Sequence, residues 1–215
     1  LAHGRSPMAL LRAVRRAGDT DDLAALCRRT VPLAAALAAR GATAATVGGL
    51  LAMTVQAVLT RLLDLLVRRF GPPPARWCFL VLGAAGRREL LPGLGIDLAV
   101  VVDDGGDDIV GRAMDTYCRA VLPALAGHLV DFGLAGTHIA GPVTLSGLPA
   151  FCRDVREGEA LDARVAAGDA GLGEGVRALM AHCRPDRETL RADLATLLDR
   201  PAPLGVHQGR LAERD

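Results

Sequence analysis

The chain has 215 residues, 51% of them hydrophobic, and a formal net charge of +1. This length and apolar content suffice for the buried core of one large domain or two small ones, and they exclude a disordered chain. The small net charge gives no overall attraction to nucleic acid or to an anionic membrane, and aromatic residues at 3% are too few for stacking single-stranded bases. We therefore expect neither nucleic acid nor a membrane as a partner.

All 25 basic residues are arginine, which excludes a lysine nucleophile or Schiff base and indicates the codon usage of a GC-rich bacterial genome. The cysteines are odd in number, widely spaced and without a CxxC pair: Cys27, Cys78, Cys118, Cys152 and Cys183. This spacing predicts buried thiols rather than disulfides or zinc ligands, as in a reducing cytosol. We therefore expect a cytoplasmic protein.

Helical periodicity in residues 1–70 predicts a small N-terminal bundle. A Ser-Pro pair at 6–7 is typical of a helix start, and a second helical run covers 20–40, in which Pro32 either kinks the helix or begins a new one. A third helix, 43–70, carries apolar residues at steps of three and four and should be the buried one. Its first part could span a membrane by composition, but its threonines and Gln56 favour the core of a soluble bundle.

The next stretch predicts two strands joined by a glycine-rich turn, after a stiff hinge of three prolines at 72–74. In chain order, it contains an apolar strand, the glycine turn, a charged segment and a second strand: 77–82, 83–86, 87–89 and 96–102. Strands of this composition are typical of the buried centre of a sheet. We therefore expect the rest of the chain to be arranged around this pair.

The glycine turn and the acidic head of the second strand form a layout for a phosphate chain and a metal. Gly83 and Gly86 carry no Cβ and can adopt positive φ, so that the backbone can approach a ligand, and the N–H groups of the helical turn that follows favour anions. Asp97 is placed for Mg²⁺, which binds one or two protein carboxylates together with phosphate oxygens. The alternative is a glycine turn that only makes a tight connection.

Beyond residue 104 the pattern predicts a helix that packs across the sheet, capped by Asp107 or Asp108 and bent near Pro123. A third strand, 136–145, is interrupted by a Gly-Pro pair, which indicates an edge or bulged position. The remaining segments predict a helix, a strand, helices divided near residue 185, and a final loop: 151–157, 160–166, 173–200 and 201–215.

The segment 160–166 indicates helix and strand equally from its residues alone. As a strand, it would turn Asp162 and Arg164 to one face. Together the elements predict an α+β fold: a small mixed β-sheet with flanking helices, preceded by an N-terminal helical bundle and followed by C-terminal helices. We expect the bundle in 1–70, the sheet domain in 71–170 and a C-terminal helical segment, truncated from a longer protein, in 171–215.

Two segments resemble known nucleotidyltransferases. The runs Leu82-Gly83-Ala84 and Gly95-Ile96-Asp97 are similar to the signature of the DNA polymerase beta superfamily, in which a hydrophobic-Gly-Ser turn precedes two acidic residues around a hydrophobic one. A closer likeness is to the Gly-Ser-x-Gly-Arg-x-Glu turn of protein-PII uridylyltransferases, and of nucleotidyltransferase-like domains that often follow cyclic-nucleotide-binding and CBS domains. It lies in four residues: Gly83, Gly86, Arg87 and Glu89.

The later segment Asp162-Ala163-Arg164 resembles the strand whose Asp-x-Arg supplies the third metal carboxylate in that superfamily. The resemblance implies a sheet of the nucleotidyltransferase type and transfer of a nucleotidyl group from a nucleoside triphosphate with Mg²⁺ in signal transduction. It implies Asp97 and Asp162 as catalytic residues and metal ligands. It implies a nucleotide site formed by Gly83, Ala84, Gly86, Arg87, Glu89 and Arg164. The implied partners are a protein or sensor domain and a second copy in a homodimer.

Two departures from the signature bear on activity. Ala84 replaces the serine of the turn, and Gly95 replaces the first metal carboxylate, whose loss should lower the rate about 10³-fold or more. Either the domain remains a transferase, with Asp103, Asp104 or Glu89 in place of the lost ligand, or it is a pseudoenzyme. A pseudoenzyme would bind a nucleotide or only a partner protein. The sequence favours impaired activity, and Arg87 and Glu89 fit structural ion pairs as well as a phosphate site.

Overall fold

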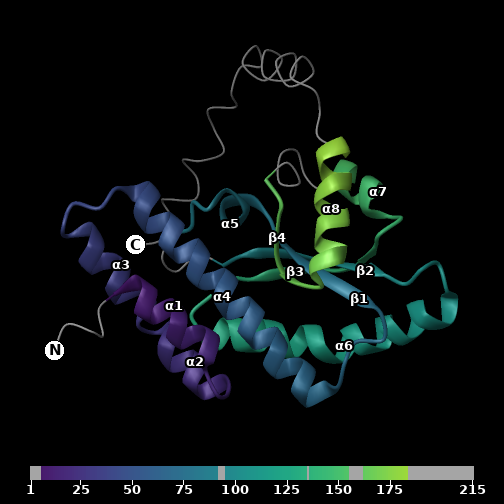
Figure 1. The fold of residues 1–215 in the computed structure, drawn as a ribbon, viewed down its shortest axis with the longest axis horizontal. Helices are drawn as coiled ribbons and strands as arrows, with labels where there is room; N and C mark the ends of the chain where they lie inside the picture. The colour runs from purple at the N-terminus through teal and green to yellow at the C-terminus, as the bar shows by residue number, and fades with distance from the viewer. Residues whose placement is uncertain (1–5, 92–94, 135, 155–161, 184–215) are drawn as a thin grey trace, which may run out of the picture. The chain divides into compact units, whose positions relative to one another are not determined.

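The computed structural model describes residues 6–91, 95–134, 136–154 and 162–183. The chain divides into a compact unit of residues 1–181 and a second unit of residues 182–215, of which only 182–183 are described. The described part of the first unit contains a sheet in the order β3-β2-β1-β4 with helices beside it (Figure 1). Its strands are β1 (Arg76–Val81), β2 (Asp97–Asp103), β3 (His138–Thr144) and β4 (Arg164–Gly168).

The sheet is mixed, as predicted. β1 pairs antiparallel with both β2 and β4, and β2 pairs parallel with β3. β3 lies at an edge, and its register with β2 shifts between Ala99 and Val101, opposite the Gly-Pro pair that lacks one backbone donor. The prediction of an edge or bulged third strand is confirmed.

The N-terminal segment forms three short helices and one long one. They are α1 (Pro7–Arg16), α2 (Thr20–Cys27), α3 (Thr30–Ala38) and α4 (Ala44–Phe70). Pro32 lies in the first turn of α3, so that it begins a new helix rather than kinking one, because the N–H that proline lacks has no helical partner there. The Asp19 carboxylate accepts from Asp22 N at 2.8 Å and caps α2.

Helix α4 lies in the hydrophobic core. Leu59 and Leu62 are fully buried, and Leu66 is 1% exposed. Among the described residues, α4 is the helix long and apolar enough to cross a membrane, but 61% of its most apolar window is buried inside the protein. This burial fits the core helix that the sequence predicts, and the apolar side chains continue directly into those of the sheet.

The sheet has an apolar layer on each face. Leu98 and Val100 share one cluster with α4 and α6 (Asp108–Asp131), whereas Ala99 and Val101 share another with α7 (Leu148–Asp154) and α8 (Ala170–Cys183). Figure 1 shows α4 and α6 on one side of the strands and α7 and α8 on the other. The α+β class with flanking helices is therefore confirmed.

Three predicted boundaries were wrong. α7 begins at Leu148 rather than Phe151, where Pro149 suits a first turn, and α8 begins at Ala170 because Asp169 accepts from Leu172 N at 2.7 Å. β4 begins only at Arg164, so that Asp162 precedes the strand. The predicted elements in 155–161 and 184–215 lie outside the described residues.

The helix after the acidic loop begins where the sequence predicts. Asp107 caps α6, because its carboxylate accepts from Ile109 N at 2.8 Å and from Val110 N at 3.2 Å. Tyr117 of α6 donates to the carbonyl oxygen of Gly71 at 2.8 Å, next to the proline hinge. This bond joins α6 to the segment that leads from α4 into β1.

Candidate functional site

The glycine turn forms a short helix, α5 (Gly83–Arg87), directly after β1. Gly83 has φ +53°, a conformation that glycine adopts without steric cost. Gly86 is required for a different reason, because a Cβ at this position would lie 1.9 Å from the carbonyl oxygen of Asp162. The turn is therefore packed against the segment that enters β4, and Ala84 is half-buried beside it.

Asp97 lies at the same end of the sheet. It is the first residue of β2, and its carbonyl oxygen accepts from Leu82 N at 2.9 Å, so that its backbone is joined to the residue that precedes α5. The side chain is exposed, and no hydrogen bond or ion pair to its carboxylate occurs within the described residues. Gly95, two residues earlier, is half-buried and leaves this end of β2 without a second carboxylate.

Asp162 is held by an arginine. Arg87 donates through Nε to Glu89 at 2.8 Å and through Nη1 to the Asp162 carboxylate. The hydrogen bond to Glu89, and next that to Asp162, raise the pKa of Arg87 above its ordinary value. The guanidinium therefore stays charged, and it neutralises the carboxylate that the resemblance assigns to a metal. The prediction that Glu89 pairs with a neighbouring arginine is confirmed.

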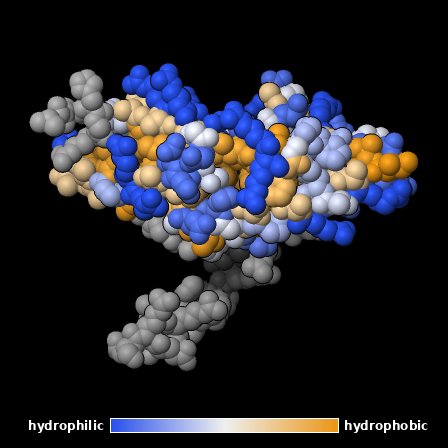
Figure 2. All heavy atoms as spheres, turned by 90° about the horizontal axis from the view of Figure 1, so that it is seen from below, coloured by the Kyte–Doolittle hydropathy of each residue, from blue (hydrophilic) through white to orange (hydrophobic). Residues whose placement is uncertain are grey.

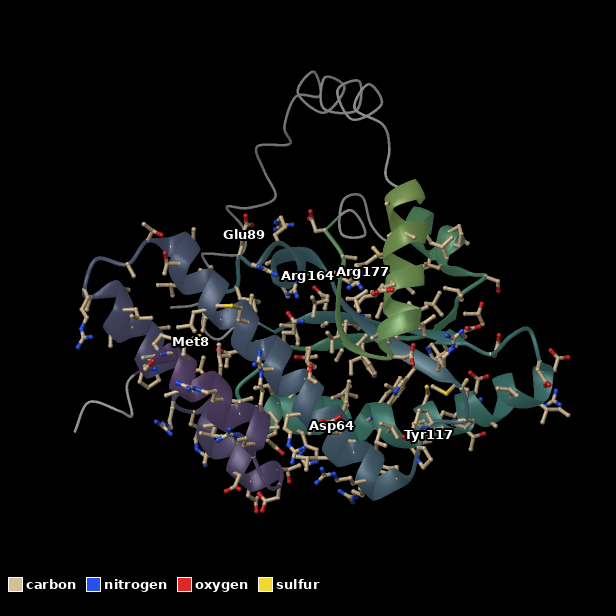
Figure 3. All side chains as sticks on the ribbon, viewed as in Figure 1. Met8, Asp64, Glu89, Tyr117, Arg164 and Arg177 are labelled. Carbon is tan, nitrogen blue, oxygen red and sulfur yellow. The ribbon has the colours of Figure 1, made fainter. Side chains whose placement is uncertain are left out.

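Arg164 has only neutral acceptors in the described part of the chain. Its Nη1 donates to the Gln56 side-chain oxygen at 2.5 Å and its Nη2 to the Ala85 carbonyl oxygen at 3.4 Å, while the buried Nε has no hydrogen-bond partner there. Burial, and next the charge of Arg88, lower the pKa of Arg164. Figure 3 shows Arg164 and Glu89 at the end of the sheet near α5. A partly buried cation without a carboxylate can bind an anion.

Helix α4 contributes to this end of the sheet, which the sequence analysis missed. Gln56 reaches Arg164, and a Cβ on Gly48 would lie 3.2 Å from the Arg88 carbonyl oxygen. Arg88 itself has φ +64°, the single non-glycine residue with positive φ in the described part of the chain. A polar Gln56 inside an apolar helix was the signal, because buried amides need partners.

The strand register places Asp97 and Arg164 on different faces. Val81 stands opposite Leu98 on one side and opposite Arg164 on the other, and residues directly opposite one another in antiparallel pairs share a face. Asp97, one position before Leu98, therefore faces the other way, toward the layer of α7 and α8. Because Asp162 lies outside β4, the expectation that strand alternation aligns it with Arg164 was wrong.

Comparison with known proteins identifies the relatives of this chain. The sequence model of a family described as "Putative nucleotidyltransferase DUF294" matches residues 28–139, about half of the chain. The chain belongs to this family. The matched region runs from the start of α3 into β3 and contains α5 and Asp97, whereas Asp162 and Arg164 lie beyond it. No curated protein matches the chain.

The donor set does not fit the Mg²⁺ site that the nucleotidyltransferase resemblance implies. In the described residues no group of three or more histidine, cysteine, aspartate or glutamate side chains could hold a metal. Asp103 lies at the opposite end of β2 from Asp97, about 20 Å along the strand, and pairs with Arg76. Asp103 and the following Asp104 therefore cannot supply the carboxylate that the resemblance implies at position 95, and Glu89 is bound to Arg87.

Proposed function

We propose that this nucleotidyltransferase-like domain binds a nucleoside triphosphate at the α5 turn and has impaired or lost nucleotidyl transfer. We further propose that it resembles the protein-PII uridylyltransferase type and acts in signalling, together with a sensor domain or partner protein. The observation that carries the loss of activity is the Arg87 bridge, because the guanidinium competes with a metal cation for the Asp162 carboxylate. Gly95 supports the same conclusion by removing a second ligand.

The nucleotide proposal is supported by the cationic groups near α5. Arg164 is partly buried, donates to no carboxylate within the described residues and keeps an unpartnered Nε. Such a guanidinium is stabilised by an anion with several oxygens, and a phosphate group can accept two parallel bonds from it. We assign Arg164 the phosphate contact and Arg87 the role of holding Asp162.

The second candidate is a pseudoenzyme that serves only as a regulatory or interaction module. The Arg87 ion pairs favour this candidate, because Arg87 and its partners Glu89 and Asp162 neutralise one another and are not free to bind a charged ligand. The two candidates differ in nucleotide binding, because only the first requires a phosphate group at Arg164.

The experiment incubates the purified protein with Mg²⁺ and each α-labelled nucleoside triphosphate, and it measures nucleotidyl transfer and pyrophosphate release. We expect rates about 10³-fold or more below those of an intact two-metal enzyme. Robust turnover that disappears in Asp97→Ala, but not in the exposed control Asp115→Ala on α6, would overturn the proposed loss of catalysis.

Binding is measured separately by titration calorimetry. We expect the wild type to bind a triphosphate and Arg164→Gln to bind it at least about tenfold more weakly, since charged hydrogen bonds to a phosphate are lost. Gly95→Asp should strengthen the binding of Mg²⁺ alone, because it returns a carboxylate two residues from Asp97, which faces away from Arg164. No heat for any triphosphate would favour the interaction module, and an unchanged Mg²⁺ titration for Gly95→Asp would contradict the proposed loss of a metal ligand.

A further inference from the structure

The N-terminal helices carry a groove far in sequence from the α5 turn. It encloses about 440 Å³, within the range of ligand clefts, which is about 300–1,000 Å³. We call it the α1–α3 groove, and its residues are Leu10, Arg28, Arg29, Pro32, Leu33, Ala36, Leu37 and Arg40. Its floor is apolar and its charged residues are all arginines, so that the groove combines two distinct kinds of surface.

The floor comes from helices whose inner faces are already packed. Leu10 of α1 is 3% exposed, and α3 buries Thr30 and Ala34. Leu33 and Leu37 remain half-buried one turn apart on α3. Apolar side chains at a spacing of four on a helix form a ridge, and this ridge can pack into a groove on the surface of another helix.

The arginines stand at both ends of α3. Arg28 and Arg29 precede the helix and Arg40 follows it, which separates them by about 18 Å at helical rise. The surrounding sequence offers few counter-charges: residues 1–70 contain ten arginines, four aspartates and no glutamate, and 23–63 contain no acidic residue. Figure 2 shows hydrophobic and strongly hydrophilic residues next to each other on the face seen from below.

We propose that the α1–α3 groove binds an acidic amphipathic helix of a partner protein. Leucine-like side chains at steps of three and four would fill the groove, and carboxylates about three turns apart would pair with Arg28 and Arg40. The helix fits better than nucleic acid, because residues 1–69 contain no phenylalanine, tyrosine or tryptophan on which bases could stack. It fits better than a lipid surface, which favours tryptophan, phenylalanine or leucine exposed along one helix face. This binding is independent of the proposed nucleotide site.

The probe is a fluorescein-labelled 18-residue helical peptide with leucines at steps of three and four in its centre and glutamates at both ends. Its affinity for the full chain is measured by fluorescence anisotropy at low and physiological salt. We expect saturable binding that weakens with salt. A peptide of the same composition in scrambled order should bind at least about tenfold more weakly, because its leucines no longer share one face.

Charge reversal separates docking from folding. The double variant Arg28→Glu with Arg40→Glu should lose at least about tenfold in affinity for the glutamate peptide and gain affinity for the same peptide with lysine at both ends. Ala36→Glu should block the floor, whereas Arg119→Glu, on the exposed side of α6, should leave binding unchanged. Circular dichroism of each variant tests whether the helix content of the chain is unchanged.

Three results would overturn the proposal. The first is no binding of the glutamate peptide, or binding that the double variant does not alter. The second is binding of phosphatidylglycerol vesicles, but not the peptide, with the same arginine dependence, which would assign the groove to a membrane surface. The third is a dimer in sedimentation equilibrium that Ala36→Glu disrupts, which would assign it to a second copy of this chain.

Discussion

The two acidic candidates lie beside the two strands that flank β1, and they are positioned in different ways. On one side, β2 pairs with β1 without interruption from Arg76–Asp103 to Val81–Leu98, and Leu98 through Val101 are fully buried. On the other side, β4 pairs over a shorter stretch whose register shifts between Phe79 and Leu80. The Asp97 backbone is therefore positioned by a regular ladder in the core.

Asp162 instead depends on close contacts and charge. The absence of a Cβ at Gly86 allows the Asp162 carbonyl oxygen to approach closely, and Arg87 donates to the Asp162 carboxylate. The absence of a Cβ at Gly168 likewise allows close contact with Trp77 and Cys78. Because a shifted register and an exposed ion pair are weaker constraints than a buried ladder, the β4 side should move more easily than the β2 side. A carboxylate on the less constrained side suits adjustable ligand contacts better than a preorganised metal site.

The substitution with the largest expected effect disrupts the packing of α5 against the segment that enters β4. Gly86→Ala places a methyl group 1.9 Å from the Asp162 carbonyl oxygen, which must move because it is backbone. We expect a loss of about 2–3 kcal/mol in the free energy of unfolding, measured with urea.

The matched control is Gly49→Ala, a helical glycine with open space around its Cβ. It should stabilise the protein by about 0.5–1 kcal/mol, because alanine restricts the unfolded chain and favours the helix. If Gly86→Ala were as stable as the wild type, the close approach of α5 to the entry of β4 would be incorrect.

A smaller effect comes from releasing Asp162. Arg87→Gln should leave the unfolding midpoint nearly unchanged, because the pair is exposed, with 44% of the arginine side chain accessible. Binding of Mn²⁺ in the absence of nucleotide should strengthen, since Asp162 loses a competing cation and the local potential becomes more negative.

Titration of Mn²⁺ by electron paramagnetic resonance reports this binding without using activity. Arg119→Gln, which removes an exposed arginine from α6, is the control for net charge. Equal Mn²⁺ affinity in wild type and Arg87→Gln would show that the ion pair does not compete with a cation, and it would remove the main support for impaired catalysis.

The smallest expected effect is a difference in reaction rate between two buried thiols. Burial raises the pKa of Cys78, in β1 opposite Gly168, and that of Cys118, in α6, from 9.0 to about 11 in each case. Both thiols should therefore stay protonated and react slowly with iodoacetamide at pH 8. Because opening of β4 uncovers Cys78 but not Cys118, Cys78 should react faster in the native protein; equal rates would contradict a looser β4 side.

The same shifts predict a pH dependence of stability. The pKa of each thiol is higher in the folded state than in the unfolded state, so that the unfolded state loses the thiol proton at a lower pH. Stability from these thiols is therefore complete below pH 9 and falls as the pH rises from about 9 to about 11. Unfolding in urea at pH 8 and pH 10.5, with Cys78→Ala and Cys118→Ala as controls, measures this loss.

Much of this architecture follows from periodicity. The apolar runs of β1 and β2, the steps of three and four in α4 and the interruption of β3 by a Gly-Pro pair all predicted the observed elements. The segment at Asp162 was harder, because its residues suit helix and strand equally, and the strand begins only at Arg164. Local preference could not decide where pairing with β1 would begin.

The sequence by itself determined the glycine turn, the acidic head of β2 and the glycine at position 95, because these are properties of residue types at fixed spacing. Only the tertiary structure decided that Gly86 serves close approach to Asp162, that Gln56 reaches Arg164, and that Arg87 binds Asp162. These contacts join residues up to 108 positions apart, and no local pattern encodes which side chains meet when a chain folds onto itself.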